Sequence, residues 1–139
     1  MKKIALILLV IVLLYAVVVN YKFIEAVAYL HDSDLTNDHK AVALLEDAIR
    51  TDRDSKSAFL LAYYYKTKKY QAINLQKSHQ NYLISAQLGD HEAKMLVAWN
   101  FYKGLGCDKD VRKSKKMLTE LAINGNSKAK EVLKFVIRN

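Results

Sequence analysis

Residues 86–129 read AQLGDHEAKMLVAWNFYKGLGCDKDVRKSKKMLTELAINGNSKA, and the end of this stretch repeats its beginning at a spacing of 36 residues. The repeated positions carry alanine and glycine: Ala86, Gly89 and Ala93 recur as Ala122, Gly125 and Ala129. Further pairs lie upstream at the same spacing: Ala62 and Ala98, Tyr65 and Phe101, Lys77 and Lys113, Ser78 and Ser114. A fixed period in the thirties is typical of arrays in which each unit buries one face against the next. The period therefore predicts a short helical solenoid.

The composition of the whole chain favours the same fold. The chain has 139 residues, no proline and four glycines. Alanine, leucine and lysine have high helix propensity, and they are frequent here. We therefore expect an all-α protein, in which antiparallel helix pairs form a short α-solenoid.

Polar residues and glycines mark where the helices begin and end. Asp90 and Asp110 are the expected N-caps of two successive helices, because their carboxylates can accept hydrogen bonds from the unpaired N–H groups of the first turn. Gly89 is expected to end the helix before Asp90, and Gly125 is expected to end the helix that Asp110 caps. Between the two helices, the glycines of Gly104-Leu105-Gly106 allow the positive φ that a tight turn requires.

These signals divide the chain into an N-terminal segment, residues 1–30, and a helical repeat domain, residues 37–139. Within the domain we expect full repeats at about residues 57–92 and 93–128. A partial repeat precedes them, and a last helix from Ser127 to about Ile137 caps the array.

The N-terminal segment has the pattern of a membrane anchor. Residues 4–19 carry no charge, Lys2 and Lys3 precede them, and the run reaches Tyr21 if Asn20 is tolerated. This approaches the roughly 20 apolar residues that a transmembrane helix needs. We therefore expect one transmembrane helix, which contacts the membrane through residues 4–21.

The charges flanking this run predict its orientation. The lysines ahead of the run should stay in the cytoplasm, which makes the protein a single-pass inner-membrane protein with its repeat domain on the periplasmic side of a two-membrane bacterium. The alternative is cleavage at Ala26-Val27-Ala28, which leaves a periplasmic domain. We expect the segment to be an anchor or an uncleaved signal, and past the span its helix should continue to about Leu30, so that the first solenoid helix can pack on this extension.

Residues 93–129 resemble the Sel-1-like repeat, a relative of the tetratricopeptide repeat with a period of about 36 residues. The positions that fit the family pattern are Ala93, Phe101, Gly104, Gly106, Asp110, Lys113, Ala122 and Gly125. Four positions depart from it: Ala98 replaces a glycine, Ser114 an alanine, Met117 a tryptophan and Cys107 a valine. The resemblance implies stacked helical hairpins that act as an adaptor for other proteins. Some small exported members of the family are immunity proteins, which neutralise toxic enzymes.

No motif for catalysis or for metal or cofactor binding stands out. The four histidines, His31, His39, His79 and His91, form no His-x3-His pair. The Gly104-Leu105-Gly106 turn lacks the third glycine and the preceding strand of a nucleotide-binding loop. Cys107 is the only cysteine, and nothing nearby in the sequence would activate its thiol. We therefore expect no enzyme, no metal and no cofactor.

Consecutive aromatic residues indicate a binding surface. Residues 63–65 are all tyrosine, and residues 99–102 read WNFY. One helical face cannot bury so many successive side chains. If Tyr65 and Phe101 point inward, the candidates for a partner-binding site in the concave groove are Tyr64, Trp99, Asn100 and Lys103. The partner would be a protein or peptide. The alternative is that these side chains only pack on adjacent helices.

Two alternatives to an adaptor role remain, and the first follows from the net charge of +8. Residues 31–139 carry +6 of this charge, but their lysines are spread over several helices, which argues against nucleic acid as the partner. A basic surface could still bind an anionic polymer or lipid through Lys109, Arg112, Lys113, Lys115 and Lys116, and such binding would weaken sharply with salt. The other alternative is an immunity protein that neutralises a toxin acting in the periplasm.

Overall fold

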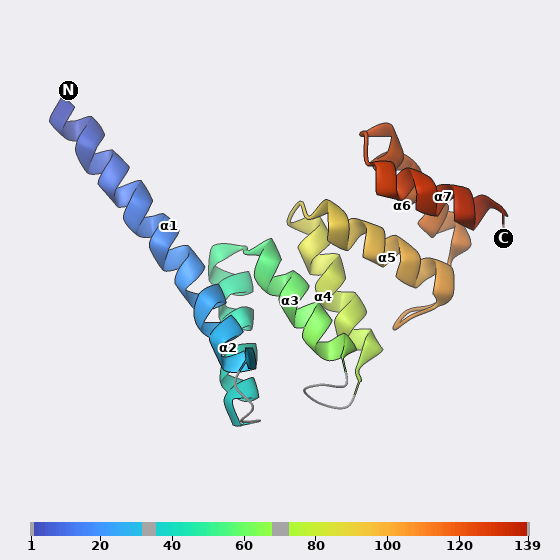
Figure 1. Ribbon diagram of the computed structural model, residues 1–139, viewed down its shortest axis with the longest axis horizontal. Helices are drawn as coiled ribbons and strands as arrows, with labels where there is room; N and C mark the ends of the chain where they lie inside the picture. The colour runs from blue at the N-terminus through green and yellow to red at the C-terminus, as the bar shows by residue number, and fades with distance from the viewer. Residues whose placement is uncertain (1, 32–35, 68–72, 139) are drawn as a thin grey trace.

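The computed structural model describes residues 2–31, 36–67 and 73–138, and within these ranges the regular structure is entirely α-helical. The helices described are α1 (Lys2–His31), α2 (Thr36–Asp52), α3 (Ser55–Lys66), α4 (Leu75–Gln87), α5 (His91–Lys103), α6 (Val111–Ile123) and α7 (Ser127–Arg138). Each helix packs on its neighbours in sequence, and the array is elongated, with the termini at opposite ends (Figure 1). The prediction of an all-α fold is confirmed.

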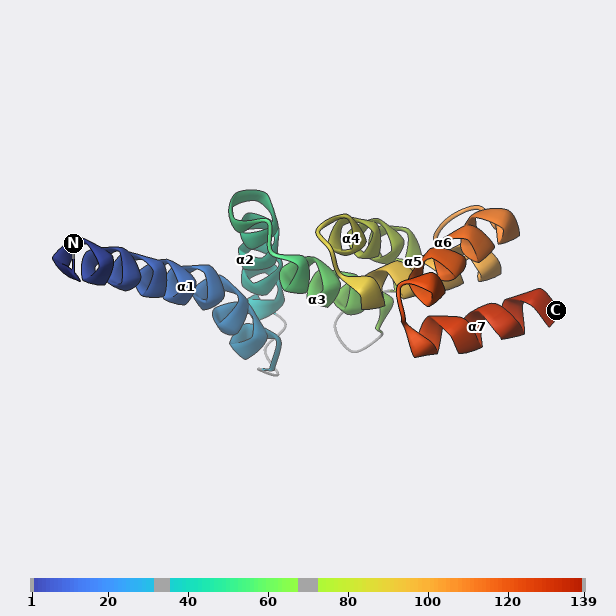
Figure 2. The same cartoon turned by 90° about the horizontal axis from the view of Figure 1, so that it is seen from above.

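The helices alternate between two sides of the molecule. Figure 2 shows α2, α4 and α6 along one side, while α1, α3 and α7 lie toward the other. We call the surface formed by α1, α3, α5 and α7 the odd-helix face. Three of its helices, α3, α5 and α7, begin at polar caps spaced 36 residues apart, so equivalent residues of successive repeats fall at equivalent places on it.

Side-chain caps begin the helices at the period seen in the sequence. Three caps of odd-numbered helices lie 36 residues apart, and each accepts a hydrogen bond from a backbone N–H three residues later: Asp54 from Ser57 (3.1 Å), Asp90 from Ala93 (3.0 Å) and Asn126 from Ala129 (2.9 Å). Asn74 and Asp110 cap α4 and α6 in the same way, at 2.9 Å each. The predicted caps Asp90 and Asp110 are confirmed, and each satisfies an N–H that would otherwise lack a partner.

Three hydrophobic clusters form the core, and each joins three consecutive helices. The first contains Ala26 and Leu30 of α1, Ala41 and Leu45 of α2, and Leu61 and Tyr64 of α3. The second contains Ala62 of α3, Tyr82 of α4, and Ala93, Val97 and Phe101 of α5. The third contains Ala98 and Tyr102 of α5, Leu118 and Leu121 of α6, and Ala129 and Val136 of α7. This is the core of a solenoid, because each helix pair is covered by the next helix.

The last turns of α1 complete the first repeat. Ala26 is fully buried and lies 36 residues before Ala62, which is also fully buried. Lys22 holds the same end of α1 on α2, because its Nζ lies 2.7 Å from Asp47 Oδ2 and 3.1 Å from Asp52 Oδ2. The prediction that the helix continues to about Leu30, with the first solenoid helix packed on it, is confirmed.

The predicted inner-membrane location is wrong. In the part of the chain that the structure describes, no helix has the combination of length and apolar character that crossing a bilayer requires. Residues 4–21 are not a separate element: they begin a 30-residue helix that continues through Lys22 and Glu25 into the first core cluster.

Candidate functional site

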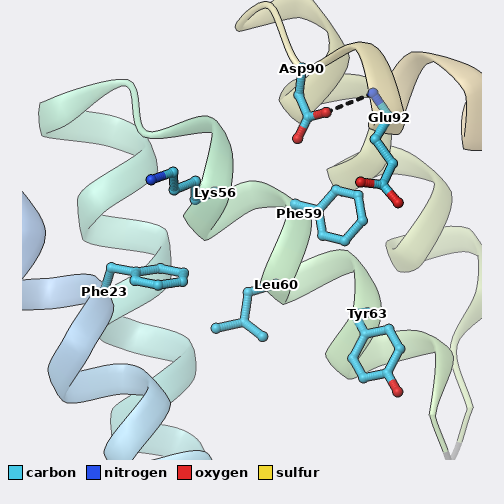
Figure 3. Close-up of a pocket in the computed structure, with 7 residues that line it drawn as sticks. All are labelled: Phe23, Lys56, Phe59, Leu60, Tyr63, Asp90 and Glu92. Atoms are coloured by element: carbon cyan, nitrogen blue, oxygen red, sulfur yellow. Dashed lines mark hydrogen bonds between the residues drawn. The ribbon is translucent and has the colours of Figure 1, made fainter.

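Two adjoining cavities open between α1 and α3 on the odd-helix face. The larger has a volume of about 360 Å³ and is lined by Phe23, Lys56, Phe59, Leu60, Tyr63, Asp90 and Glu92. Figure 3 shows Phe23 on α1 facing Leu60 on α3, with Asp90 and Glu92 at the start of α5. The smaller has a volume of about 120 Å³, and its lining includes Val27 and His31 together with the same Leu60 and Tyr63. These shared side chains make the two cavities one apolar depression with a charged border.

A third cavity lies further along the same face. Its volume is about 360 Å³, and it is lined by Lys66 of α3, Met95, Leu96 and Trp99 of α5, and Val132 of α7. Every residue that lines it belongs to an odd-numbered helix. The odd-helix face is therefore hollowed at both ends of the array.

The cavities share one pattern of lining residues, repeated every 36 positions. Three sets of positions are equivalent. They are Phe23, Phe59 and Met95; Leu60, Leu96 and Val132; and Val27, Tyr63, Trp99 and Phe135. Tyr63 is 51% exposed and Phe135 is 46% exposed. Exposed apolar side chains that gather on one face of a soluble fold mark an interaction site. The equivalent positions form an apolar ladder along the odd-helix face.

Trp99 and Lys103 also lie on this face. The Trp99 ring is half-buried, with its centroid 5.5 Å from that of Tyr102 and 5.9 Å from that of Phe135. Lys103 is exposed, and its Nζ lies 5.2 Å from the Trp99 centroid. Trp99 thus packs partly on α7 and keeps part of its ring accessible. Its predicted role in binding a partner stays a prediction.

Tyr64 and Asn100 are buried, although Tyr64 contributes to the lining of the smaller cavity. Their predicted role in binding a partner stays a prediction. Tyr64 is 2% exposed, and its hydroxyl donates to Asp38 Oδ2 at 3.4 Å. Burial, helped by the nearby Asp38 carboxylate, raises the pKa of Tyr64 to about 12. Asn100 is 8% exposed, and its Nδ2 lies 3.3 Å from His79 Nδ1. The physical reason is the period: positions 64 and 100 are equivalent, and the helix turns both toward the preceding repeat.

Tyr63 is the exposed aromatic residue that the sequence analysis missed. It precedes Trp99 by 36 residues, whereas Tyr64 precedes Asn100 by that number. The period therefore pairs Tyr63 with Trp99, and this signal was available in the sequence.

Basic side chains follow one border of the odd-helix face. Each odd-numbered helix has a basic residue in its last turn: His31, Lys66, Lys103 and Arg138. All four side chains are exposed. The opposite border, where the odd-numbered helices begin, has mixed charge at Lys56, Asp90 and Glu92.

The basic residues around α6 do not form one free patch. Lys113 Nζ lies 4.1 Å from the Phe101 ring centroid, and Lys109 Nζ lies 6.0 Å from that of Tyr102. Lys115 is half-buried. Two of these five cations are thus stacked on aromatic rings, where their charge is partly engaged.

Neither a metal centre nor an activated thiol is found in the described ranges. No group of three or more His, Cys, Asp or Glu side chains there is arranged to hold a metal ion. Burial, with a smaller contribution from Asp108, raises the pKa of the Cys107 thiol. A raised pKa lowers the fraction of thiolate, which is the nucleophilic form.

Solved structures of similar shape are known, although the sequence matches no protein-family model and no curated protein. A Sel1 repeat protein from Oxalobacter formigenes superposes with a TM-score of 0.69 and 26% sequence identity, over 84% of this chain and 87% of that one. Cysteine rich protein B of Helicobacter pylori superposes with a TM-score of 0.60 and 22% identity, over 68% of this chain and 71% of that one. The second likeness concerns the fold alone.

Proposed function

We propose that this chain, which is built as a Sel1-like repeat protein, is a non-enzymatic adaptor that binds a segment of another protein on its odd-helix face. Its likeness to Sel1 repeat proteins supports an interaction scaffold in general. The cavities of this chain support the odd-helix face as the binding surface.

The observation that carries the proposal is the apolar ladder, in which Tyr63 and Trp99 occupy equivalent positions next to cavities of about 360 Å³ each. Large aromatic side chains beside hollows are typical of residues that dominate binding energy in interfaces. Solenoids present such ready-made surfaces because the repeats stack in register. Lys56, His31 and Lys103 supply the polar rim that fixes the orientation of a partner.

Two observations support the non-enzymatic part of the proposal. The side chains that line the cavities are mainly apolar, and the carboxylate of Asp90 is engaged in capping α5. The shift of the Cys107 pKa disfavours its use as a nucleophile. An adaptor needs only shape and complementary chemistry at the surface.

Site-specific photocrosslinking in living cells tests the proposal. A photoreactive amino acid replaces Tyr63, Trp99 or, as a matched control, the exposed Lys116 of α6 in the full chain. We expect Tyr63 and Trp99 to give adducts with the same partner protein, and Lys116 to give none. The Trp99→Ala variant should weaken co-purification of that partner at low and at moderate salt alike.

Two outcomes contradict the proposal. One is the absence of any adduct from Tyr63 and Trp99 when the chain is folded and abundant. The other is equal crosslinking from Lys116, together with binding that collapses between low and moderate salt, because this behaviour indicates an anionic ligand on the basic surface of α6.

A further inference from the structure

The odd-helix face has a one-sided charge pattern that restricts what can bind there. Lys66 lines the cavity beside Trp99, and Lys103 lies over the Trp99 ring at 5.2 Å. His31 lines the smaller cavity beside Tyr63. The basic border therefore runs next to the apolar ladder, where a bound partner would face it.

We propose that the segment bound on this face is an amphipathic α-helix with an acidic flank. Its apolar stripe covers Tyr63 and Trp99, and its carboxylates face Lys66 and Lys103. This inference rests on the proposed function and adds the chemistry of the partner.

The polarity of the cavities favours a helical partner over an extended one. The floor consists of Phe23, Phe59, Leu60, Leu96 and Val132, whose side chains offer no hydrogen bonds. The backbone of the odd-numbered helices is already paired internally. An extended segment would bury backbone N–H and C=O groups without partners, which is costly. An amphipathic helix satisfies its own backbone and buries only apolar side chains.

The charges favour an acidic flank over a basic one. Lysines in the last turn of a helix are stabilised by the negative end of the helix dipole, but that effect is worth only about 0.3–1 kcal/mol at an exposed site. The exposed ammonium group of Lys66 therefore remains able to pair with carboxylates. Lys103 is also exposed, but its Nζ lies 5.2 Å from the Trp99 ring centroid and 5.0 Å from that of Tyr102, so its charge is partly engaged by these rings and partly open to a carboxylate. The net charge of +8 also speeds the approach of an acidic partner and repels a basic one.

Selection from a display library of random 16-residue peptides on the immobilised full chain tests this inference. The Tyr63→Glu variant serves for counter-selection, because Tyr63 is 51% exposed and its replacement spares the core. We expect peptides rich in Asp and Glu, with apolar residues spaced three and four apart. Trp99 is the only tryptophan of the chain, so its emission should shift when a selected peptide is added.

A charge reversal with a matched control gives the second readout. Lys66→Glu combined with Lys103→Glu should weaken the selected peptides at least about tenfold, since two favourable rim pairs are replaced by repulsion. Arg112→Glu combined with Lys116→Glu changes the net charge equally on exposed positions of α6 and should have a much smaller effect. The selected peptides should become helical on binding, as circular dichroism would show.

The outcomes separate the two proposals. Three outcomes overturn the acidic helix but leave the protein-binding face intact: the selected peptides are basic or uncharged, they bind in an extended form, or both double variants lose equal affinity for them. The acidic helix is also overturned if the selected peptides match segments of this chain and the chain associates with itself through Tyr63. The proposed function fails as well if the full chain selects only peptides that the Tyr63→Glu variant also selects, and if Tyr63 and Trp99 give no crosslinks.

Discussion

His79 and Asn100 form a buried polar pair that accounts for the absence of Asn100 from the surface. The amide Nδ2 lies 3.3 Å from His79 Nδ1, and an amide N–H can donate only to an unprotonated ring nitrogen. The His79 ring also meets Phe101 edge-on, with centroids 5.0 Å apart. Burial, and secondarily the positive charge of Lys113, lowers the pKa of His79 below its ordinary value of 6.5. The pair therefore holds the neutral imidazole.

This shift predicts a loss of stability in acid. Above pH 6.5 His79 is neutral in both the folded and the unfolded chain, so it adds no pH dependence. Below 6.5 the unfolded chain takes up a proton that the folded chain resists, so the free energy of unfolding should fall until the folded pKa is reached. Urea denaturation at a series of pH values between 7.5 and 5 measures this slope. The slope should decrease in His79→Gln.

The control for this experiment is His91→Gln, because the His91 side chain is exposed. This variant should keep the acid dependence of the parent chain. An unchanged slope in His79→Gln would show that other groups cause the loss of stability.

The turn between α5 and α6 shows how one element positions another. Gly104 and Gly106 both have positive φ, at 74° and 71°, so the predicted tight turn is confirmed. A Cβ on Gly106 would overlap the backbone carbonyl of Leu75 and lie 2.9 Å from Gln76 N. The turn therefore lies directly on the first residues of α4, and it links the second helix pair to the third.

This close approach predicts unequal effects of two similar substitutions. Gly106→Ala and Gly125→Ala both force alanine into a left-handed conformation, which costs roughly 1–2 kcal/mol. Only Gly106→Ala also collides with backbone, whereas a Cβ at Gly125 meets nothing within 4 Å. We expect the extra loss in Gly106→Ala to be about 1–3 kcal/mol, as for other overpacked sites. Chemical denaturation measures both, and equal losses would mean that the turn moves away from α4 without cost.

Within the described residues, the core of the molecule is a row of three clusters joined through shared helices. α3 contributes Leu61 and Tyr64 to the first cluster and Ala62 to the second. α5 links the second cluster to the third in the same way. In such an array, stability is close to a sum of local terms and of interfaces between neighbours. The loss of stability caused by a substitution at one end should therefore be confined to the helices near that end.

Two cavity-creating substitutions at opposite ends test this. Leu45 and Leu121 are both buried, and leucine-to-alanine changes in a core cost about 2–5 kcal/mol. In Leu45→Ala, hydrogen exchange should accelerate in α2 and in the last turns of α1, while α6 and α7 keep nearly their original rates. Leu121→Ala should show the reverse pattern. Equal acceleration along the whole chain in either variant would instead indicate a single cooperative unit.

The sequence by itself determined the helical architecture, because caps, glycine turns and small core residues recur at one spacing. Asp90, Asp110 and Gly104 act through local backbone geometry, and local geometry can be read from neighbouring residues. The candidate surface was predicted by a different argument, the inward register of Tyr65 and Phe101, which named Tyr64 and Asn100 together with Trp99 and Lys103.

Only the tertiary structure decided which of the consecutive aromatic residues faces outward. Successive residues of a helix point roughly 100° apart, so the neighbouring helices determine that Tyr64 is buried against Asp38 and that Tyr63 is exposed. The role of α1 was decided in the same way, because its apolar run resembled a separate span, while its last turns are held on α2 through Lys22 and Ala26. Burial depends on contacts between residues far apart in the chain, and these exist only once the helices are stacked.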